Sequence, residues 1–247
     1  NEVSPERYID LFVDLGRQGN NTSVYLWGGE PMLYDGVLNV MAGATRLRMP
    51  VAIATNGTHL AASARFLVEM PLFLLQVSID GHRADLHNRL RPSAGQGDNF
   101  RQIVDGLKSV RNMRHQLGRN LPLIACLTVI SRDNAAHLED IYERFRHNVD
   151  LFVFYLSWWI DEQSAEAHER DYARRFGRRP ALHRGWIGGW QPDPEACDII
   201  EQQLAELTRR SRPASMPPVT VIPPVRGAEN LRTYYSDHRA GFGYNQC

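Results

Sequence analysis

The chain has few cysteines, no long apolar run and no excess of charge of either sign. Its three cysteines, Cys126, Cys197 and Cys247, lie far apart, which excludes a disulfide framework and a local metal-binding motif. No apolar run approaches the roughly 20 residues of a membrane-spanning helix, and no signal-peptide pattern is present. Basic and acidic residues both number 28, so we expect no nucleic-acid or membrane partner. These absences predict a cytoplasmic protein.

The composition is that of a soluble folded domain. Hydrophobic residues make up 43% and charged residues 23% of the 247 residues, enough for a substantial core. The sequence starts directly at a helix signal, Ser4-Pro5-Glu6, and stops within Gly243-Tyr244-Asn245-Gln246-Cys247. We therefore expect these residues to be the interior of a longer protein.

Apolar segments alternate with amphipathic segments along most of the chain. The predicted strands cover residues 23–27, 51–55, 72–79, 121–130, 151–159 and 219–222, and helices follow most of them. Repeated strand–helix units build a parallel sheet, and nearly continuous apolar strands indicate that both faces are covered. The pattern leaves two architectures open, a doubly wound sheet and a full or partial barrel.

Three further segments carry weaker predictions. Residues 82–97 form a polar crossing. A charged helix begins at Asp161, and its predicted inner face consists of Ala165, His168, Tyr172 and Phe176. The tail from Arg226 has no clear period, which predicts a linker.

The predicted strands end in residues suited to ligand binding. In either architecture, ligands bind at the carboxyl ends of parallel strands. The first predicted strand runs into Gly28-Gly29-Glu30-Pro31, where flexible backbone meets a fixed charge, as in a ligand shelf. The residues at the strand ends are Gly28, Gly29, Glu30, Asn56, Asp80, Ser131 and Ser157. Without the later motifs, an ordinary strand-to-helix turn would explain the first of these segments.

The motifs at these strand ends resemble a known family. Trp27-Gly28-Gly29-Glu30-Pro31, Ala54-Thr55-Asn56-Gly57 and Val77-Ser78-Ile79-Asp80-Gly81, then His87-Asn88 and Arg91, resemble the ordered motifs of radical S-adenosylmethionine (radical SAM) enzymes. The nearest branch carries a C-terminal SPASM or twitch domain with auxiliary iron–sulfur clusters. Residues 243–247 resemble the lead-in to the first auxiliary-cluster cysteine, which would make Cys247 a metal ligand.

The resemblance implies a fold and a division of the chain. The fold class is α/β, a partial (β/α)6 TIM-like barrel that lacks its first strand. Residues 1–225 would form the radical SAM core, and residues 226–247 would lead into the auxiliary-cluster region.

The resemblance also implies cofactors and residue roles. A [4Fe–4S] cluster would bind S-adenosylmethionine (SAM), and reduction by flavodoxin or ferredoxin would release a 5′-deoxyadenosyl radical that takes hydrogen from substrate. Gly28, Gly29, Glu30 and Pro31 would meet the SAM amino group. Asn56, Ser78 and Asp80 would meet its ribose and methionine portions, Arg91 the methionine carboxylate, and Val129 and Ser131 the adenine.

The sequence departs from the family at one place. The cluster-binding pattern Cys-x3-Cys-x2-Cys is absent, and Cys126 and Cys197 have the surroundings of structural cysteines. Truncation would explain the missing cysteines and the missing first strand together. As given, the chain is predicted not to bind the cluster or turn over.

Three interpretations remain open. The first is a radical SAM enzyme that modifies a peptide or protein side chain, or a carbohydrate-like metabolite. The second is an ordinary barrel or doubly wound enzyme without a cluster. The third is a degenerate family member that acts as a binding or scaffold module.

Overall fold

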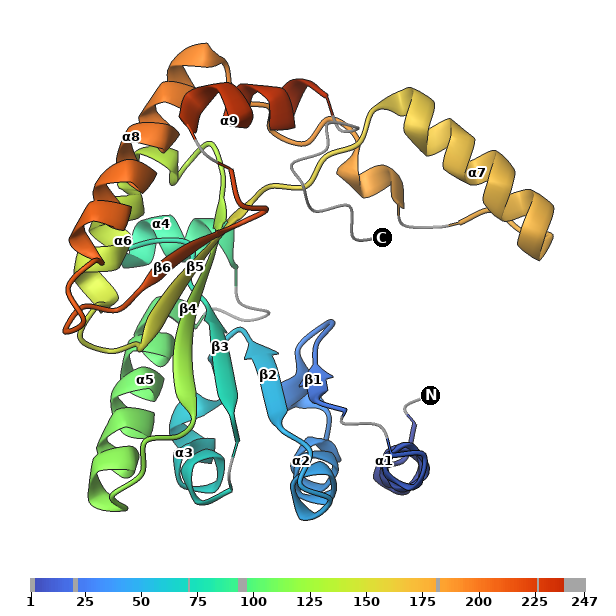
Figure 1. The fold of residues 1–247 in the computed structure, drawn as a ribbon, viewed down its shortest axis with the longest axis vertical. Coiled ribbons are helices and arrows are strands. Elements are labelled where there is room, and N and C mark those ends of the chain that lie inside the picture. Colours follow the sequence, from blue (N-terminus) through green and yellow to red (C-terminus); the bar gives the residue numbers. More distant parts are fainter. Residues whose placement is uncertain are drawn as a thin grey trace.

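The computed structural model describes residues 3–19, 22–70, 72–92, 97–180, 183–225 and 227–237. Six parallel strands form one sheet in the order β1-β2-β3-β4-β5-β6, so every strand pairs with its neighbour in sequence. The strands are β1 (Val24–Leu26), β2 (Val51–Thr55), β3 (Leu74–Ser78), β4 (Leu123–Ile130), β5 (Leu151–Leu156) and β6 (Val219–Ile222). The sheet is curved like part of a barrel wall (Figure 1). The predicted α/β fold with a partial TIM-like barrel is confirmed.

Helices connect the strands. They are α1 (Pro5–Arg17), α2 (Val37–Arg46), α3 (Leu60–Glu69), α4 (Ala84–Leu90), α5 (Asn99–Gln116), α6 (Leu138–Phe145), α7 (Glu162–Phe176), α8 (Pro194–Arg210) and α9 (Gly227–Ser236). Short 3-10 turns are η1 (Pro31–Leu33), η2 (Ala135–His137) and η3 (His183–Trp186). Asp98, Asp161 and Asp193 cap α5, α7 and α8, since each carboxylate accepts a backbone N–H three residues on. None of the described helices is long and apolar enough to cross a membrane.

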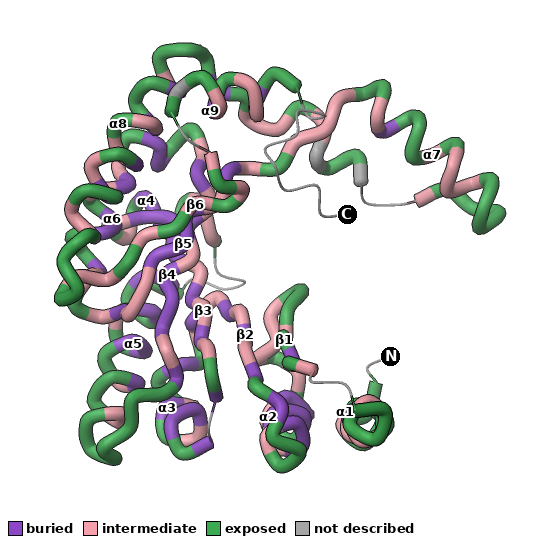
Figure 2. The backbone as a smooth tube through the Cα atoms, in the orientation of Figure 1, coloured by how far each residue is buried: buried purple, intermediate pink, exposed green. Residues whose placement is uncertain are grey.

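The core lies between the convex face of the sheet and the helices outside it. Buried residues concentrate in this layer in Figure 2, where β2 and β3 show alternating burial along the strand. Val51, Ile53 and Leu75 are fully buried, whereas Ala52 and Gln76 on the other face are half-buried. The prediction that both faces are covered is therefore wrong for these strands, because a partial barrel keeps its concave face accessible.

Several predicted element boundaries differ from the structure. The helix expected to follow Pro31 divides into η1 and α2, and β5 ends at Leu156 rather than at residue 159. The polar crossing contains helix α4. The tail contains α9, which packs on α8 and buries Leu231 and Tyr235, four residues apart. The segment predicted as a linker thus contains a helix over residues 227–236, which two buried side chains anchor.

Helix α7 projects away from the sheet (Figure 1). Among its residues Ala165 alone is buried; His168 is exposed and Phe176 is 62% exposed. The predicted inner face is therefore confirmed for Ala165 and wrong for His168 and Phe176, because no layer of the sheet lies beneath this helix. Ion pairs from Arg184 to Glu162, at 2.6 Å, and to Glu169 link α7 to η3 instead.

Candidate functional site

The glycine shelf after β1 is joined to the end of β2 by the Glu30 carboxylate. Glu30 Oε1 accepts hydrogen bonds from Met32 N at 3.0 Å and from Thr55 Oγ1 at 2.7 Å, and Oε2 accepts one from Asn56 N at 2.6 Å. The carboxylate thus caps η1 and also ties two strand ends together. We assign Glu30 a positioning role, and the exposed surface of the shelf consists of the neighbouring residues Gly28 and Gly29.

Gly28 and Gly29 leave that shelf open. Gly28 has a φ of +110°, which favours glycine, and a Cβ added at either residue would meet nothing within 4 Å. Neither carbonyl accepts a hydrogen bond from the described part of the chain. Two backbone acceptors therefore stand exposed beside the end of β1.

The turn after β2 holds its own asparagine. Asn56 Oδ1 accepts from Thr58 N at 3.0 Å and from Thr58 Oγ1 at 2.7 Å, as in an Asx turn. Gly57 has a φ of +83°, and a Cβ there would lie 2.8 Å from Ile103 Cγ1. The side-chain amide of Asn56 remains the group that can donate to a ligand.

Asp80 joins the ends of β3 and β4. It is buried, its Oδ1 accepts from Val129 N at 2.9 Å, and its Oδ2 pairs with Arg91 Nε. Burial raises the pKa of Asp80, while Arg91 and the Val129 N–H oppose the rise. Asp80 thus uses both oxygens within the chain, whereas the two terminal nitrogens of Arg91 form no hydrogen bond with the described residues.

Asn134 connects the same two strand ends from the other side. Its Nδ2 donates to Asp80 O at 3.1 Å and to Val129 O at 2.9 Å, and its Oδ1 accepts from Ser131 N at 2.8 Å. The hydroxyl of Ser131 is buried and has no partner among the described residues. Ser131 and Val129 are therefore held in place through their backbones.

His87 lies beneath the Asp80 turn. Its side chain is fully buried, and its Nδ1 accepts from Asp80 N at 3.2 Å. Nδ1 is thus the acceptor, and Nε2 carries the proton. Burial, aided by repulsion from Arg91, lowers the pKa of His87 to about 4.

The concave face of the sheet carries polar side chains below these strand ends. Gln76 and Ser78 lie two residues apart on β3 and therefore on the same face of the strand. The Tyr25 hydroxyl on β1 donates a hydrogen bond to Gln76 Oε1. Tyr155 on β5 lies opposite Val129 in the register. These residues extend the site from the sheet edge into the barrel.

The described cysteines do not fit an iron–sulfur cluster. Cys126 is fully buried in β4, and burial raises its pKa to about 12. Cys197 is buried in α8, and burial raises its pKa too. Thiolates are the cluster ligands, so these two thiols are structural. Cys247 lies outside the described residues.

Sequence reasoning placed the strand ends but missed the residues that join them. Thr55 and His87 lie within the quoted motifs but, like Asn134, were given no role, although all three contact a predicted site residue. The Ser131-Arg132-Asp133-Asn134 run carries an Asx-turn signal that could have indicated Asn134. Nothing in the sequence indicated that Thr55 would meet Glu30. Ser157, also at a strand end, instead lies near the Tyr235 hydroxyl, at 3.3 Å.

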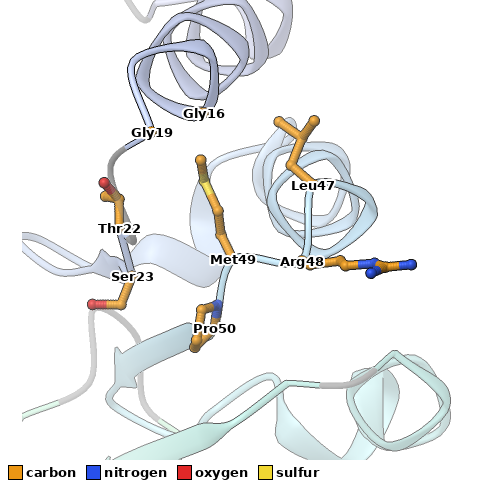
Figure 3. A pocket seen from close by; sticks show the side chains of 8 residues that line it. All are labelled: Gly16, Gly19, Thr22, Ser23, Leu47, Arg48, Met49 and Pro50. Atoms are coloured by element: carbon orange, nitrogen blue, oxygen red, sulfur yellow. The ribbon is translucent and has the colours of Figure 1, made fainter.

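A cavity lies at the opposite edge of the sheet. It measures about 470 Å³ and is lined by residues at the end of α1 and before β1 and β2, among them Ser23 and Pro50. Arg48 extends away from Thr22 and Ser23 (Figure 3). The cavity brings together none of the strand-end residues, so we place the candidate site at the carboxyl edge.

Comparison with known proteins identifies the family. The model of the radical SAM superfamily matches residues 1–145. An AdoMet-dependent heme synthase from Oleidesulfovibrio alaskensis is 26% identical over 136 residues, 55% of this chain and 31% of that protein. A cysteine-type anaerobic sulfatase-maturating enzyme from Clostridium novyi is 27% identical over 144 residues, 55% of this chain and 36% of that protein. The chain thus spans about a third of these relatives.

Solved structures share the fold. SuiB from Streptococcus suis bound to S-adenosylmethionine superposes with a TM-score of 0.61 at 13% identity, over 96% of this chain and 46% of that one. SuiB bound to its precursor peptide SuiA gives 0.59 at 13% identity, over 89% and 43%. The family match covers more than half of the sequence and includes all four strand ends described above. The chain therefore belongs to the radical SAM superfamily.

Proposed function

We propose that this chain is the SAM-binding core of an enzyme that uses a 5′-deoxyadenosyl radical to take hydrogen from a peptide or protein side chain. The observation that carries the proposal is the linked edge of the sheet. Glu30 joins the end of β1 to that of β2, Asp80 joins the end of β3 to that of β4, and β2 pairs with β3, so the four strand ends form one continuous ledge. A continuous ledge suits a cofactor whose reactive bond must be oriented.

The residues of the ledge fit SAM. The open Gly28 and Gly29 carbonyls would accept from its ammonium group. The Asn56 amide and the half-buried Ser78 hydroxyl would meet its hydroxyl groups, and the terminal nitrogens of Arg91 its carboxylate. Adenine would lie against Val129. Glu30 and Asp80 would act mainly by positioning, because their oxygens already have donors within the chain.

The described residues of this chain include no cysteines that fit as ligands of the [4Fe–4S] cluster in this proposal. When bound, a [4Fe–4S] cluster supplies the electron that breaks a SAM carbon–sulfur bond; flavodoxin or ferredoxin would be its donor. Auxiliary clusters and a metal-binding role for Cys247 stay predictions.

Two lines of evidence support a peptide or protein substrate. The chain is similar to a sulfatase-maturating enzyme in sequence and to the peptide-bound SuiB in fold. Its concave face offers Tyr25, Gln76 and Tyr155, whose hydroxyls and amide can bind backbone amides. The same groups suit the hydroxyls of a carbohydrate-like molecule, the alternative substrate. The misfit of the buried cysteines favours the remaining alternative, a SAM-binding module without cleavage.

The test is the formation of 5′-deoxyadenosine. The natural full-length protein would be reconstituted anaerobically with iron and sulfide, reduced, given SAM, and analysed by mass spectrometry. We expect 5′-deoxyadenosine, and at least tenfold weaker SAM binding by Asp80→Asn. Exposed Glu69→Gln is the matched control. SAM binding without cleavage, when the cluster is intact, would indicate a binding module; absence of SAM binding would refute the proposal.

A further inference from the structure

Two histidines and an aspartate meet in the segments that follow β3 and β4. His82 lies in the loop after β3, His137 ends η2, and Asp140 lies in the first turn of α6. One ligand atom from each lies within 4.8 Å of the others, and His137 Nδ1 is 2.9 Å from Asp140 Oδ2. The His82 and His137 rings are 5.0 Å apart between centroids. Three metal-ligating side chains from two separate loops thus converge.

His82 has a nitrogen that the chain leaves unsatisfied. Its Nδ1 is buried and forms no hydrogen bond with the described residues. A buried polar atom without a partner is unfavourable, so native structures rarely keep one without a reason.

We propose that His82, His137 and Asp140 bind a divalent first-row transition-metal ion, with Zn²⁺ as the reference ion. Imidazole nitrogens suit zinc, iron and nickel, and two histidines with one carboxylate form a recurrent ligand set. His137 and Asp140 are three residues apart at a helix start, which places them on one side. Asp140 is exposed, so its carboxylate can turn to complete the set.

The surrounding charges permit a cation. Arg83 is the adjoining cationic residue, but its guanidinium pairs with Asp85 at 2.9 Å. Arg89 pairs with Asp133 at 3.2 Å. Because these arginines are already paired with carboxylates, Asp140 gives the cluster of His82, His137 and Asp140 a net negative charge. This charge would partly offset the positive charge of the ion.

The ion would brace the loops that carry the candidate site. His82 follows Asp80 by two residues, and His137 follows Asn134 by three. Asn134 already links the two segments by hydrogen bonds to Asp80 O and Val129 O. Metal binding would add a second link between them, and it does not depend on whether the chain cleaves SAM.

The experiment measures zinc bound by the natural full-length protein. Wild type, His82→Ala and Asp140→Asn would be equilibrated with Zn²⁺, desalted and analysed for zinc per chain. Exposed His147→Ala is the matched control. X-ray absorption at the zinc edge then separates the proposed site from cysteine sites, because imidazole and carboxylate ligands lie at about 2.0–2.1 Å and sulfur at about 2.3 Å.

We expect wild type and the His147 variant to hold one zinc more per chain than either site variant, with nitrogen and oxygen scatterers. Zinc should also raise the thermal midpoint of wild type and of the control, and not that of Asp140→Asn, whose exposed side chain can change without loss of the fold. Equal zinc content in all four proteins, or zinc with sulfur scatterers alone, would overturn the proposal.

Discussion

Replacing His87 by asparagine should remove a pH dependence of stability that wild type shows between pH 7.5 and 5. His87 is fully buried, and its pKa of about 4 lies below the 6.5 of an unperturbed histidine. The unfolded state therefore binds the proton first, so stability is fully present above pH 6.5 and is lost as the pH falls toward 4. Asparagine keeps an acceptor for Asp80 N and does not titrate.

The size of the effect follows from the two pKa values. At pH 5 about 97% of unfolded but only about 10% of folded molecules carry the proton, a difference of about 30-fold in the unfolding equilibrium. That factor corresponds to about 2 kcal/mol, whereas at pH 7.5 the same contribution is below about 0.1 kcal/mol. The pKa of His82 is also lowered, but His82 is present in both proteins and cancels in the comparison.

The assay is urea unfolding at a series of pH values, with wild type, His87→Asn and exposed His115→Asn compared. The free energy of unfolding of wild type and of the His115 variant should fall by about 2 kcal/mol more than that of His87→Asn. His87→Asn will be less stable than wild type at pH 7.5, because the smaller side chain leaves space beside Phe100. The quantity to compare is therefore the change in the free energy of unfolding with pH. Parallel curves for wild type and His87→Asn would refute the reasoning.

Three other substitutions test the ledge and its supports. Glu30→Gln should lower the free energy of unfolding by about 1–3 kcal/mol and weaken SAM binding, because the amide NH2 would face backbone and hydroxyl groups that are themselves donors. Urea unfolding measures the first effect and calorimetry the second. Unchanged SAM binding would contradict the positioning role. Asn134→Ala should lower the free energy of unfolding by about 2–4 kcal/mol, because it removes the amide that donates to the buried Asp80 carbonyl and the partly buried Val129 carbonyl. A loss below about 1 kcal/mol in urea unfolding would count against that. Gly57→Ala should cost about 2–4 kcal/mol because of its φ and its 2.8 Å approach to Ile103, whereas Gly177→Ala, with φ +66° and open space, should cost only about 1 kcal/mol.

The sequence predicted where helices and strands lie better than it predicted which of their faces are buried. Asp161 and Asp193 can be identified as helix caps from the sequence, because a cap needs only a backbone N–H a few residues further along the chain. The apolar face of α7 was misread because an amphipathic stripe does not reveal whether a partner lies beneath it. Helix α9 was missed because it is short and its two buried residues give little periodicity. Burial depends on the whole chain, and one segment does not contain that information.

The same limit applies to the candidate site. Gly28, Asn56 and Asp80 could be chosen because strand ends and turn residues are local features. The Glu30 contacts to Thr55 and Asn56 span 25 and 26 residues, and Asp80 reaches Val129 across 49. Carboxylates that looked like ligand contacts in the sequence are engaged by the chain. The sequence was sufficient to propose this edge, but the contacts of its residues depend on long-range pairing.

One device accounts for the geometry of this edge. Where a parallel strand ends, the next strand exposes a backbone N–H that the ladder no longer pairs. Glu30 meets the N–H of Asn56 one strand over, and Asp80 meets that of Val129 in the same way. Because a carboxylate satisfies each of these donors, the acceptors left at the shelf are carbonyls, those of Gly28 and Gly29. An edge that binds its own donors and exposes carbonyls is suited to a cationic ligand, and the ammonium and sulfonium groups of SAM have that charge.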